Sequence, residues 1–210
     1  MVGRLSWVVG SVVAVILVVV AFLGAFVLRA PGPLQGPTTN IHLETVAAVN
    51  QAVEWARPND PHPDWVSYLP TTILRVPANA TIKVTIDQED GATGLRNPFW
   101  GQVQGTDGNK MHVKYTDDNG NQQEADMTSI DPTRAAHTFA VPDLGVFVPL
   151  LGVSDNAAPG ATNVITFTFH TKGKGIYHWQ CFVPCAAGTV FGNGGPMQTL
   201  GYMAGQLIVE

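Results

Sequence analysis

The side chains best suited to chemistry are those of the two cysteines, Cys181 and Cys185, which lie near the end of the 210-residue chain with three residues between them. Soft thiolates favour Cu(I), and this pair together with one histidine and one methionine could hold a single copper ion. A disulfide between Cys181 and Cys185 is the alternative, because a domain outside the cytoplasm meets oxidising conditions. A pair of free thiols is the third interpretation.

Short strands must position these cysteines. Alternating apolar and polar residues predict strands on both sides of a turn at 77–79, and further strands at 137–141, 145–152, 163–170, 176–181 and 205–209. Short strands separated by turn residues predict an all-β antiparallel sandwich or barrel. On the strand that ends at Cys181, residue parity places Trp179 on the same face as the thiol and His178 on the opposite face. We therefore expect Trp179 in the core and His178 at the surface.

Two other stretches of the domain carry weaker patterns. Residues 88–135 are rich in Gly, Asp and Asn, and they predict irregular structure with short strands near 99–104 and 110–115. Residues 40–56 carry apolar side chains at helix-like spacing and contain no Gly or Pro, which predicts a short helix. We therefore divide the chain into an anchor over 1–29, a linker with a short helix over 30–69, and a domain over 70–210.

The N-terminal residues Trp7 to Leu28 form a run of 22 residues without a charge. Such a run is long enough for a helix to cross a hydrocarbon core of about 30 Å. A cleaved signal peptide is the rival interpretation, but its apolar region is normally about 7–15 residues long. We expect an uncleaved, single-pass anchor in the cell membrane, with the following domain on the extracytoplasmic side.

The charge of the chain limits its partners. Residues 30–210 carry nine Lys and Arg against 16 Asp and Glu, a net charge of 9 − 16 = −7. Binding to nucleic acid needs a basic surface, so we expect no nucleic-acid partner. An acidic domain permits docking of a basic partner, such as a cationic electron carrier.

Three segments of this sequence together resemble the cupredoxins. They are TTILRVPANATIKVTID at 71–87, AHTFAV at 136–141, and the final stretch from Pro159 through KGIYHWQC at 174–181 to MAGQLIV at 203–209. The Cys-x-x-x-Cys pair and the single anchor are most similar to the copper-A domain of cytochrome oxidase subunit II. The resemblance implies a Greek-key, cupredoxin-like antiparallel β-sandwich, with 88–135 as an inserted or divergent stretch.

The resemblance also implies a set of copper ligands. By position, these are the side chains of His137, Cys181, Cys185 and Met203, and the backbone carbonyl of Val183. Met197 competes with Met203, and either methionine could instead fill apolar space. The family has a second histidine four residues after its second cysteine. Thr189 occupies that position here, and no histidine follows His178 in this sequence.

Three functions follow from these features. The first is respiratory electron transfer by a membrane-anchored, extracytoplasmic cupredoxin that resembles subunit II and works with other respiratory subunits or a soluble carrier. The second is a copper-free structural subunit of a membrane respiratory complex, with a Cys181–Cys185 disulfide. The third is a Cu(I) carrier or metallation factor. The sequence contains no nucleophile elbow, zinc-protease motif, P-loop or dinucleotide fingerprint, so we expect no catalytic motif of its own.

Overall fold

The computed structural model describes residues 37–46, 65–185 and 195–210. These residues form eleven strands and five short 3-10 helices. The strands are β1 Thr38–Val46, β2 Ser67–Leu69, β3 Ile73–Val76, β4 Thr81–Gln88, β5 Met111–Thr116, β6 Gln122–Met127, β7 Ala135–Val141, β8 Val146–Leu151, β9 Asn163–His170, β10 Gly175–Gln180 and β11 Ala204–Val209. The 3-10 helices are η1 Pro98–Gly101, η2 Asp107–Asn109, η3 Pro132–Arg134, η4 Pro142–Leu144 and η6 Gly195–Met197.

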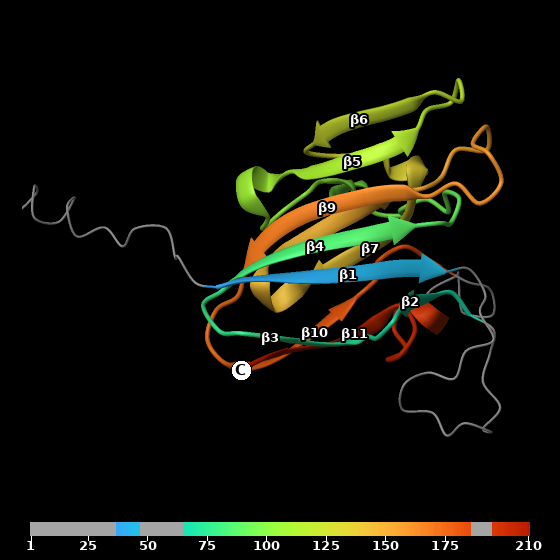
Figure 1. Cartoon of the computed structure of the whole chain (residues 1–210). Helices are drawn as coiled ribbons and strands as arrows, with labels where there is room; N and C mark the ends of the chain where they lie inside the picture. Colours follow the sequence, from blue (N-terminus) through green and yellow to red (C-terminus); the bar gives the residue numbers. More distant parts are fainter. Residues whose placement is uncertain (1–36, 47–64, 186–194) are drawn as a thin grey trace, which may run out of the picture. The chain divides into compact units, whose positions relative to one another are not determined.

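The strands form two sheets, which confirms the all-β class (Figure 1). One sheet has the order β2-β1-β4-β9-β5-β6, and the other has the order β3-β11-β10-β7-β8. Most neighbours are antiparallel, as predicted, but β1 pairs with β4 and β3 pairs with β11 in parallel. The sheets are therefore mixed rather than purely antiparallel.

The core lies where inward-facing side chains of the two sheets meet. Alternate residues of β4, which are Ile82, Val84 and Ile86, are fully buried, as strand geometry requires of one face. From the other sheet, Phe139 and Trp179 join the same buried cluster. Burial of large apolar side chains at roughly 25 cal/mol per Å² is the main stabilising term for such a sandwich.

The predicted helix over 40–56 is wrong for the part that the structure describes. Residues 38–46 form β1, which pairs with β4 from Thr38 opposite Thr81 to Thr45 opposite Gln88. Its apolar side chains alternate, so that Leu43 is buried while His42 and Glu44 are exposed. Backbone pairing with a strand about 40 residues away therefore overrides the helix-like spacing. The remainder of the predicted helix, 47–56, lies outside the described residues.

The stretch 88–135 contains more regular structure than the sequence predicts. The strand expected near 110–115 is confirmed as β5, and β6 pairs beside it at the sheet edge. The strand expected over 99–104 is wrong, because Pro98 begins η1 there and the side chain of Asn97 caps it by accepting a bond from the Phe99 N–H. Proline at the start of a helical turn and a side-chain cap favour this turn over a strand.

No helix in the described ranges is long and apolar enough to cross a membrane. The predicted anchor over 1–29 lies outside those ranges. It stays a prediction.

Candidate metal centre

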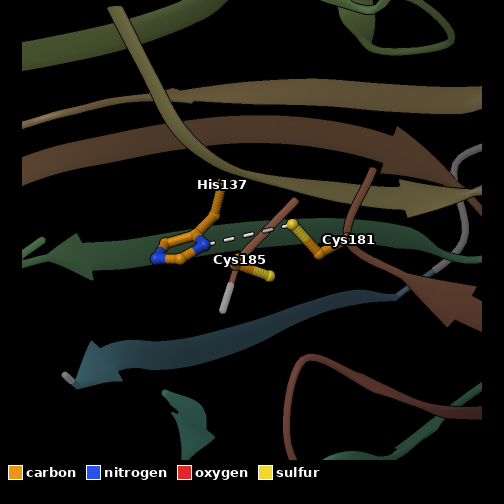
Figure 2. Close-up of side chains that lie close together, drawn as sticks. All are labelled: His137, Cys181 and Cys185. Carbon is orange, nitrogen blue, oxygen red and sulfur yellow. Dashed lines mark hydrogen bonds between the residues drawn. The ribbon is translucent and has the colours of Figure 1, made fainter. Parts of the chain in front are cut away.

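Three potential metal ligands converge between the two sheets. His137 lies on β7, Cys181 follows the last residue of β10, and Cys185 lies four positions further along (Figure 2). One ligand atom from each residue lies within 4.8 Å of those of the other two. The three residues are only 2%, 0% and 4% exposed, respectively. The structure thus brings together three of the five predicted ligands in a site closed to bulk water.

Backbone groups hold the sulfur of Cys181 in place. The backbone N–H of Cys181 donates to the carbonyl of Met203 at 2.9 Å, which continues the β10–β11 pairing past the strand end. The N–H groups of Thr138 and Val183 point to the sulfur, at 3.4 and 3.3 Å. Two amide donors stabilise a thiolate, because the negative charge accepts their hydrogen bonds without rearrangement. The site therefore favours the ionised form that binds metal.

The two cysteines differ in their protonation. Burial opposes ionisation of Cys181, but the hydrogen bond from Cys185, the neighbouring His137 and the Thr138 N–H together lower the Cys181 pKa well below its usual value. The hydrogen bond to Cys181 and burial raise the pKa of Cys185. These shifts favour ionisation of Cys181 over ionisation of Cys185 in the metal-free site. Binding of a metal through both sulfurs must release the Cys185 proton.

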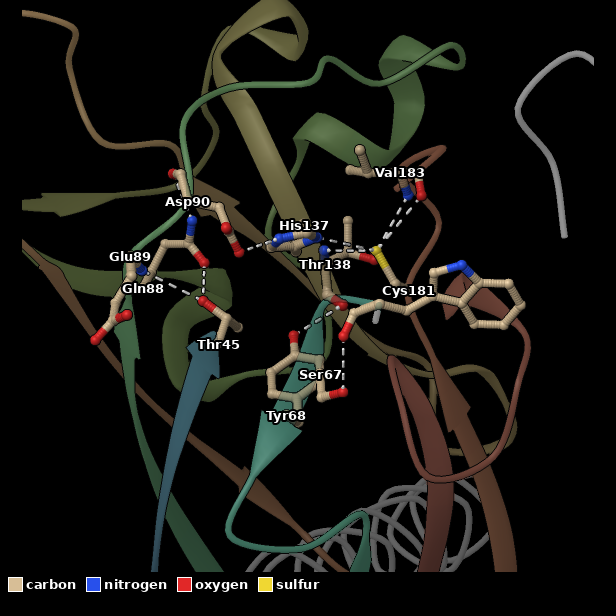
Figure 3. A network of polar contacts seen from close by, with 11 residues as sticks. Thr45, Ser67, Tyr68, Gln88, Glu89, Asp90, His137, Thr138, Cys181 and Val183 are labelled. Atoms are coloured by element: carbon tan, nitrogen blue, oxygen red, sulfur yellow. Dashed lines mark hydrogen bonds and ion pairs between the residues drawn. The ribbon is translucent and has the colours of Figure 1, made fainter. Parts of the chain in front are cut away.

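The imidazole of His137 is held from both sides. Its Nδ1 lies 4.0 Å from the Cys181 sulfur, and its Nε2 donates to the Asp90 carboxylate at 2.8 Å (Figure 3). Burial lowers the pKa of His137, but the hydrogen bonds to Asp90 and Cys181 outweigh it and raise this pKa to about 9. The metal-free site therefore favours a protonated imidazole beside the Cys181 sulfur. A soft cation could replace the Nδ1 proton between them.

The structure places the other two predicted ligands next to this cluster. The Val183 carbonyl oxygen lies 3.6 Å from the Cys181 sulfur, on the same turn that supplies an N–H donor. Met203 is fully buried, and its carbonyl is bonded to Cys181 as described above. The thioether of Met203 as a ligand stays a prediction. Met197, its competitor, is also buried, and Pro196 beside it accepts a bond from the Met203 N–H.

Both cysteines are free thiols in this structure. The Cys181–Cys185 disulfide would therefore be an oxidised state of the same loop, and it stays a prediction. Formation of that bond would bring the two sulfurs to about 2.05 Å and leave neither of them able to bind a metal as a thiolate.

The other histidines of the described ranges point elsewhere. His178 is exposed and hydrogen-bonds Gln180, while Trp179 between them is fully buried, so the parity argument is confirmed. His42, His112 and His170 pair with surface carboxylates. His62 lies outside the described residues. In the ranges that the structure describes, His137 is therefore the one imidazole at this site.

The chemistry of the donor set suits copper. Two thiol sulfurs and one imidazole nitrogen fit a soft ion such as Cu(I), whereas a structural zinc site normally needs four ligands. The buried apolar surroundings also suit a metal whose potential depends on exclusion of water. The residues present therefore fit copper.

Two contributors could not be found from the sequence. Asp90 contacts His137 across 47 positions, from a stretch that predicts only irregular structure. Thr138 supports the site through its backbone and its hydroxyl. Its N–H points to the Cys181 sulfur, and its Oγ1 accepts a bond from the Phe182 N–H at 2.8 Å. Its carbonyl accepts a bond from the Tyr68 hydroxyl at 3.1 Å. In the sequence, the one feature that points to Thr138 is its position directly after His137.

Comparisons with known proteins find matches among solved structures, at low sequence identity. No protein-family model matches this sequence, and no curated protein matches it. Among solved structures, rusticyanin from Thiobacillus ferrooxidans is 18% identical, with a TM-score of 0.31, over 84% of this chain and 79% of rusticyanin.

Two larger enzymes are also similar. Copper nitrite reductase from Nitrosomonas europaea is 14% identical, with a TM-score of 0.36, over 82% of this chain and 41% of the enzyme. A multi-copper oxidase from Pseudomonas thermotolerans is 12% identical, with a TM-score of 0.36, over 84% of this chain and 30% of the oxidase.

Proposed function

We propose that this chain is a membrane-anchored, extracytoplasmic cupredoxin that transfers electrons in a respiratory chain, as a subunit II-like protein. The observation that carries the proposal is the buried cluster of His137, Cys181 and Cys185. Bound copper would supply one-electron cycling between Cu(I) and Cu(II). The ligand side chains come from β7 and from the turn after β10, which ties them to the core.

Burial of the ligands favours electron transfer over copper delivery. A carrier must release its ion to a partner, which requires ligands that the partner can reach. The three side chains here are nearly inaccessible, and one of the two amide donors to the Cys181 sulfur, that of Thr138, belongs to strand β7. Fixed donors cost little rearrangement when the charge of a site changes, and this is what rapid electron transfer needs.

The Cu(I) carrier is the second candidate, and one specific observation favours it. A stable Cu(II) site of the blue-copper kind uses two imidazoles, and the described part of this chain brings one. A donor set of two sulfurs and one nitrogen instead prefers Cu(I). The two candidates thus differ in whether Cu(II) is held as firmly as Cu(I).

The test is to load the full-length chain with copper in detergent and cycle it with redox mediators in the presence of a Cu(I) chelator. Electron transfer predicts repeated, reversible one-electron cycles with the copper retained by the protein. The carrier predicts transfer of copper to the chelator in the first reduced phase. No copper uptake, together with an intact mass two hydrogens below that of the dithiol, would support the disulfide-containing structural subunit.

The acidic domain suits a basic electron donor. Its net charge of −7 over residues 30–210 would attract a cationic carrier, and screening by salt would weaken that attraction. The rate of reduction by a basic carrier should therefore fall as ionic strength rises. A rate that is independent of ionic strength would remove this part of the proposal.

A further inference from the structure

Asp90 lies outside the segments that resemble a known family, yet its carboxylate forms the one hydrogen bond to the far side of the His137 ring. The two atoms, His137 Nε2 and Asp90 Oδ2, are 2.8 Å apart, with the side chains 3% and 15% exposed. The other histidine–carboxylate pairs in the described ranges have histidines that are 38–60% exposed. This pair is therefore the one that bulk water does not screen.

The position of Asp90 is itself fixed by a buried polar chain. The Asp90 carbonyl accepts the Gln88 side-chain N–H at 2.7 Å and the Val153 backbone N–H at 2.9 Å. Gln88 is fully buried at the end of β4, and the Thr45 hydroxyl of β1 donates to its Oε1 (Figure 3). Strands β1 and β4 and the segment that follows β8 thus meet at Asp90. An acidic residue in a loop without such anchoring would turn towards solvent.

A carboxylate in this position has two consequences for His137. Because Nε2 donates to Asp90, the ring is oriented with Nδ1 towards the Cys181 sulfur at 4.0 Å. The negative charge of the carboxylate also makes the imidazole a stronger electron-pair donor to a metal. A more highly charged metal ion at Nδ1 is therefore favoured. In a low-dielectric interior this effect is much larger than on the surface.

We propose that Asp90 is a positioning residue that aims Nδ1 of His137 into the cysteine cluster and lowers the reduction potential of copper bound there. This inference rests on the proposed function, since it concerns copper at the same three ligands. Asp90 is not one of the ligands. It acts through the imidazole ring of His137, which it holds in place.

The test is to replace Asp90 by Asn in the full-length chain, with Asp87→Asn as the matched control. Asp87 also pairs with a histidine at 2.8 Å, but that histidine is the exposed His42 on the neighbouring strand. Outer partners of metal ligands typically contribute about 10-fold or more in metal affinity. D90N should therefore weaken Cu(II) relative to Cu(I) by about tenfold and raise the midpoint potential by about 59 mV, the value of a tenfold change in a one-electron couple.

D87N should titrate like the wild type, and D90E, which keeps the charge, should recover part of the shift. A wild-type midpoint in D90N overturns the tuning role although copper is bound. Absence of copper from the wild type overturns the proposed function first, and the tuning role with it. The two failures are therefore distinguishable.

The positioning role has its own readout in the metal-free protein. Long-range proton–nitrogen NMR spectra should show a protected Nε2–H signal of His137, assigned by its loss in H137Q. This signal should be lost in D90A, which removes the acceptor, and kept in D87A. A signal that D90A leaves unchanged contradicts the positioning role, even if the midpoint potential of D90N is shifted.

Discussion

Replacement of Gly205 by Ala should loosen the part of the sandwich that carries the cysteine cluster. Gly205 lies on β11 opposite Trp179 of β10, and a Cβ there would lie 1.9 Å from the carbonyl oxygen of Thr72. Cβ atoms essentially never come closer than 3.0 Å to such an atom, so one strand must move by 3.0 − 1.9 = 1.1 Å. The same oxygen accepts the Gln206 N–H at 2.9 Å and the Trp179 indole N–H at 3.1 Å, and this movement breaks that geometry.

The cost can be worked out from these contacts. Overpacking in a core costs about 1–3 kcal/mol, and a buried N–H left without a partner costs about 1–3 kcal/mol more. We therefore expect G205A to lower the free energy of unfolding by about 2–6 kcal/mol, which corresponds to roughly 10 °C or more in Tm for a domain of this size. Thermal unfolding followed by circular dichroism measures it. Gly173→Ala is the control, because its Cβ would meet no atom within 4 Å. Equal Tm values for G205A and G173A would show that a Cβ at position 205 does not disturb the sandwich.

Three further substitutions address the site and its support. Met203→Leu keeps the buried volume, so it should cost less than about 1.5 kcal/mol in urea unfolding yet change the copper potential; an unchanged potential removes Met203 from the ligand set. Cys181→Ser should lose about tenfold or more copper affinity relative to Cys185→Ser in a competition titration, because Cys181 accepts the two amide donors. Equal losses would mean that those donors do not matter. Trp179→Phe removes the indole donor to Thr72 and should lower the unfolding free energy by about 2 kcal/mol; a variant as stable as the wild type would show that this bond contributes nothing.

Local pattern predicted the last strands of the sandwich well. The stretches expected at 163–170, 176–181 and 205–209 correspond to β9, β10 and β11 within a residue at each end. Their alternation survives because each strand buries one face in the shared core. Trp179 was placed in the core for the same reason, and it is fully buried against Phe139, with ring centroids 5.2 Å apart.

The first strand could not be predicted in this way. Leu43 and Thr45 of β1 are buried because β1 pairs in parallel with β4, about 40 residues away. Apolar residues in its neighbourhood also fit a helical period, and no local feature decides between the two. Pairing across such a distance depends on the assembled sheet rather than on the propensity of the segment.

The sequence predicts the ligands of the candidate site but not the residues that hold those ligands in place. The spacing of Cys181 and Cys185 and the position of His137 are visible in the sequence. Asp90, which holds His137, comes from a Gly- and Asp-rich stretch in which no carboxylate stands out. Its role arises from burial and from the anchoring of its backbone to Gln88, both of which exist only after the sheets have formed.

Binding of copper by His137, Cys181 and Cys185 as one buried centre can be measured on the loaded full-length chain. Copper per chain is determined, and visible absorption and EPR spectra of the oxidised form are recorded beside those of C181S. We expect stoichiometric copper and an intense thiolate–copper absorption band that C181S lacks. Retention of the same band and the same copper content by C181S would show that these residues do not form the copper centre.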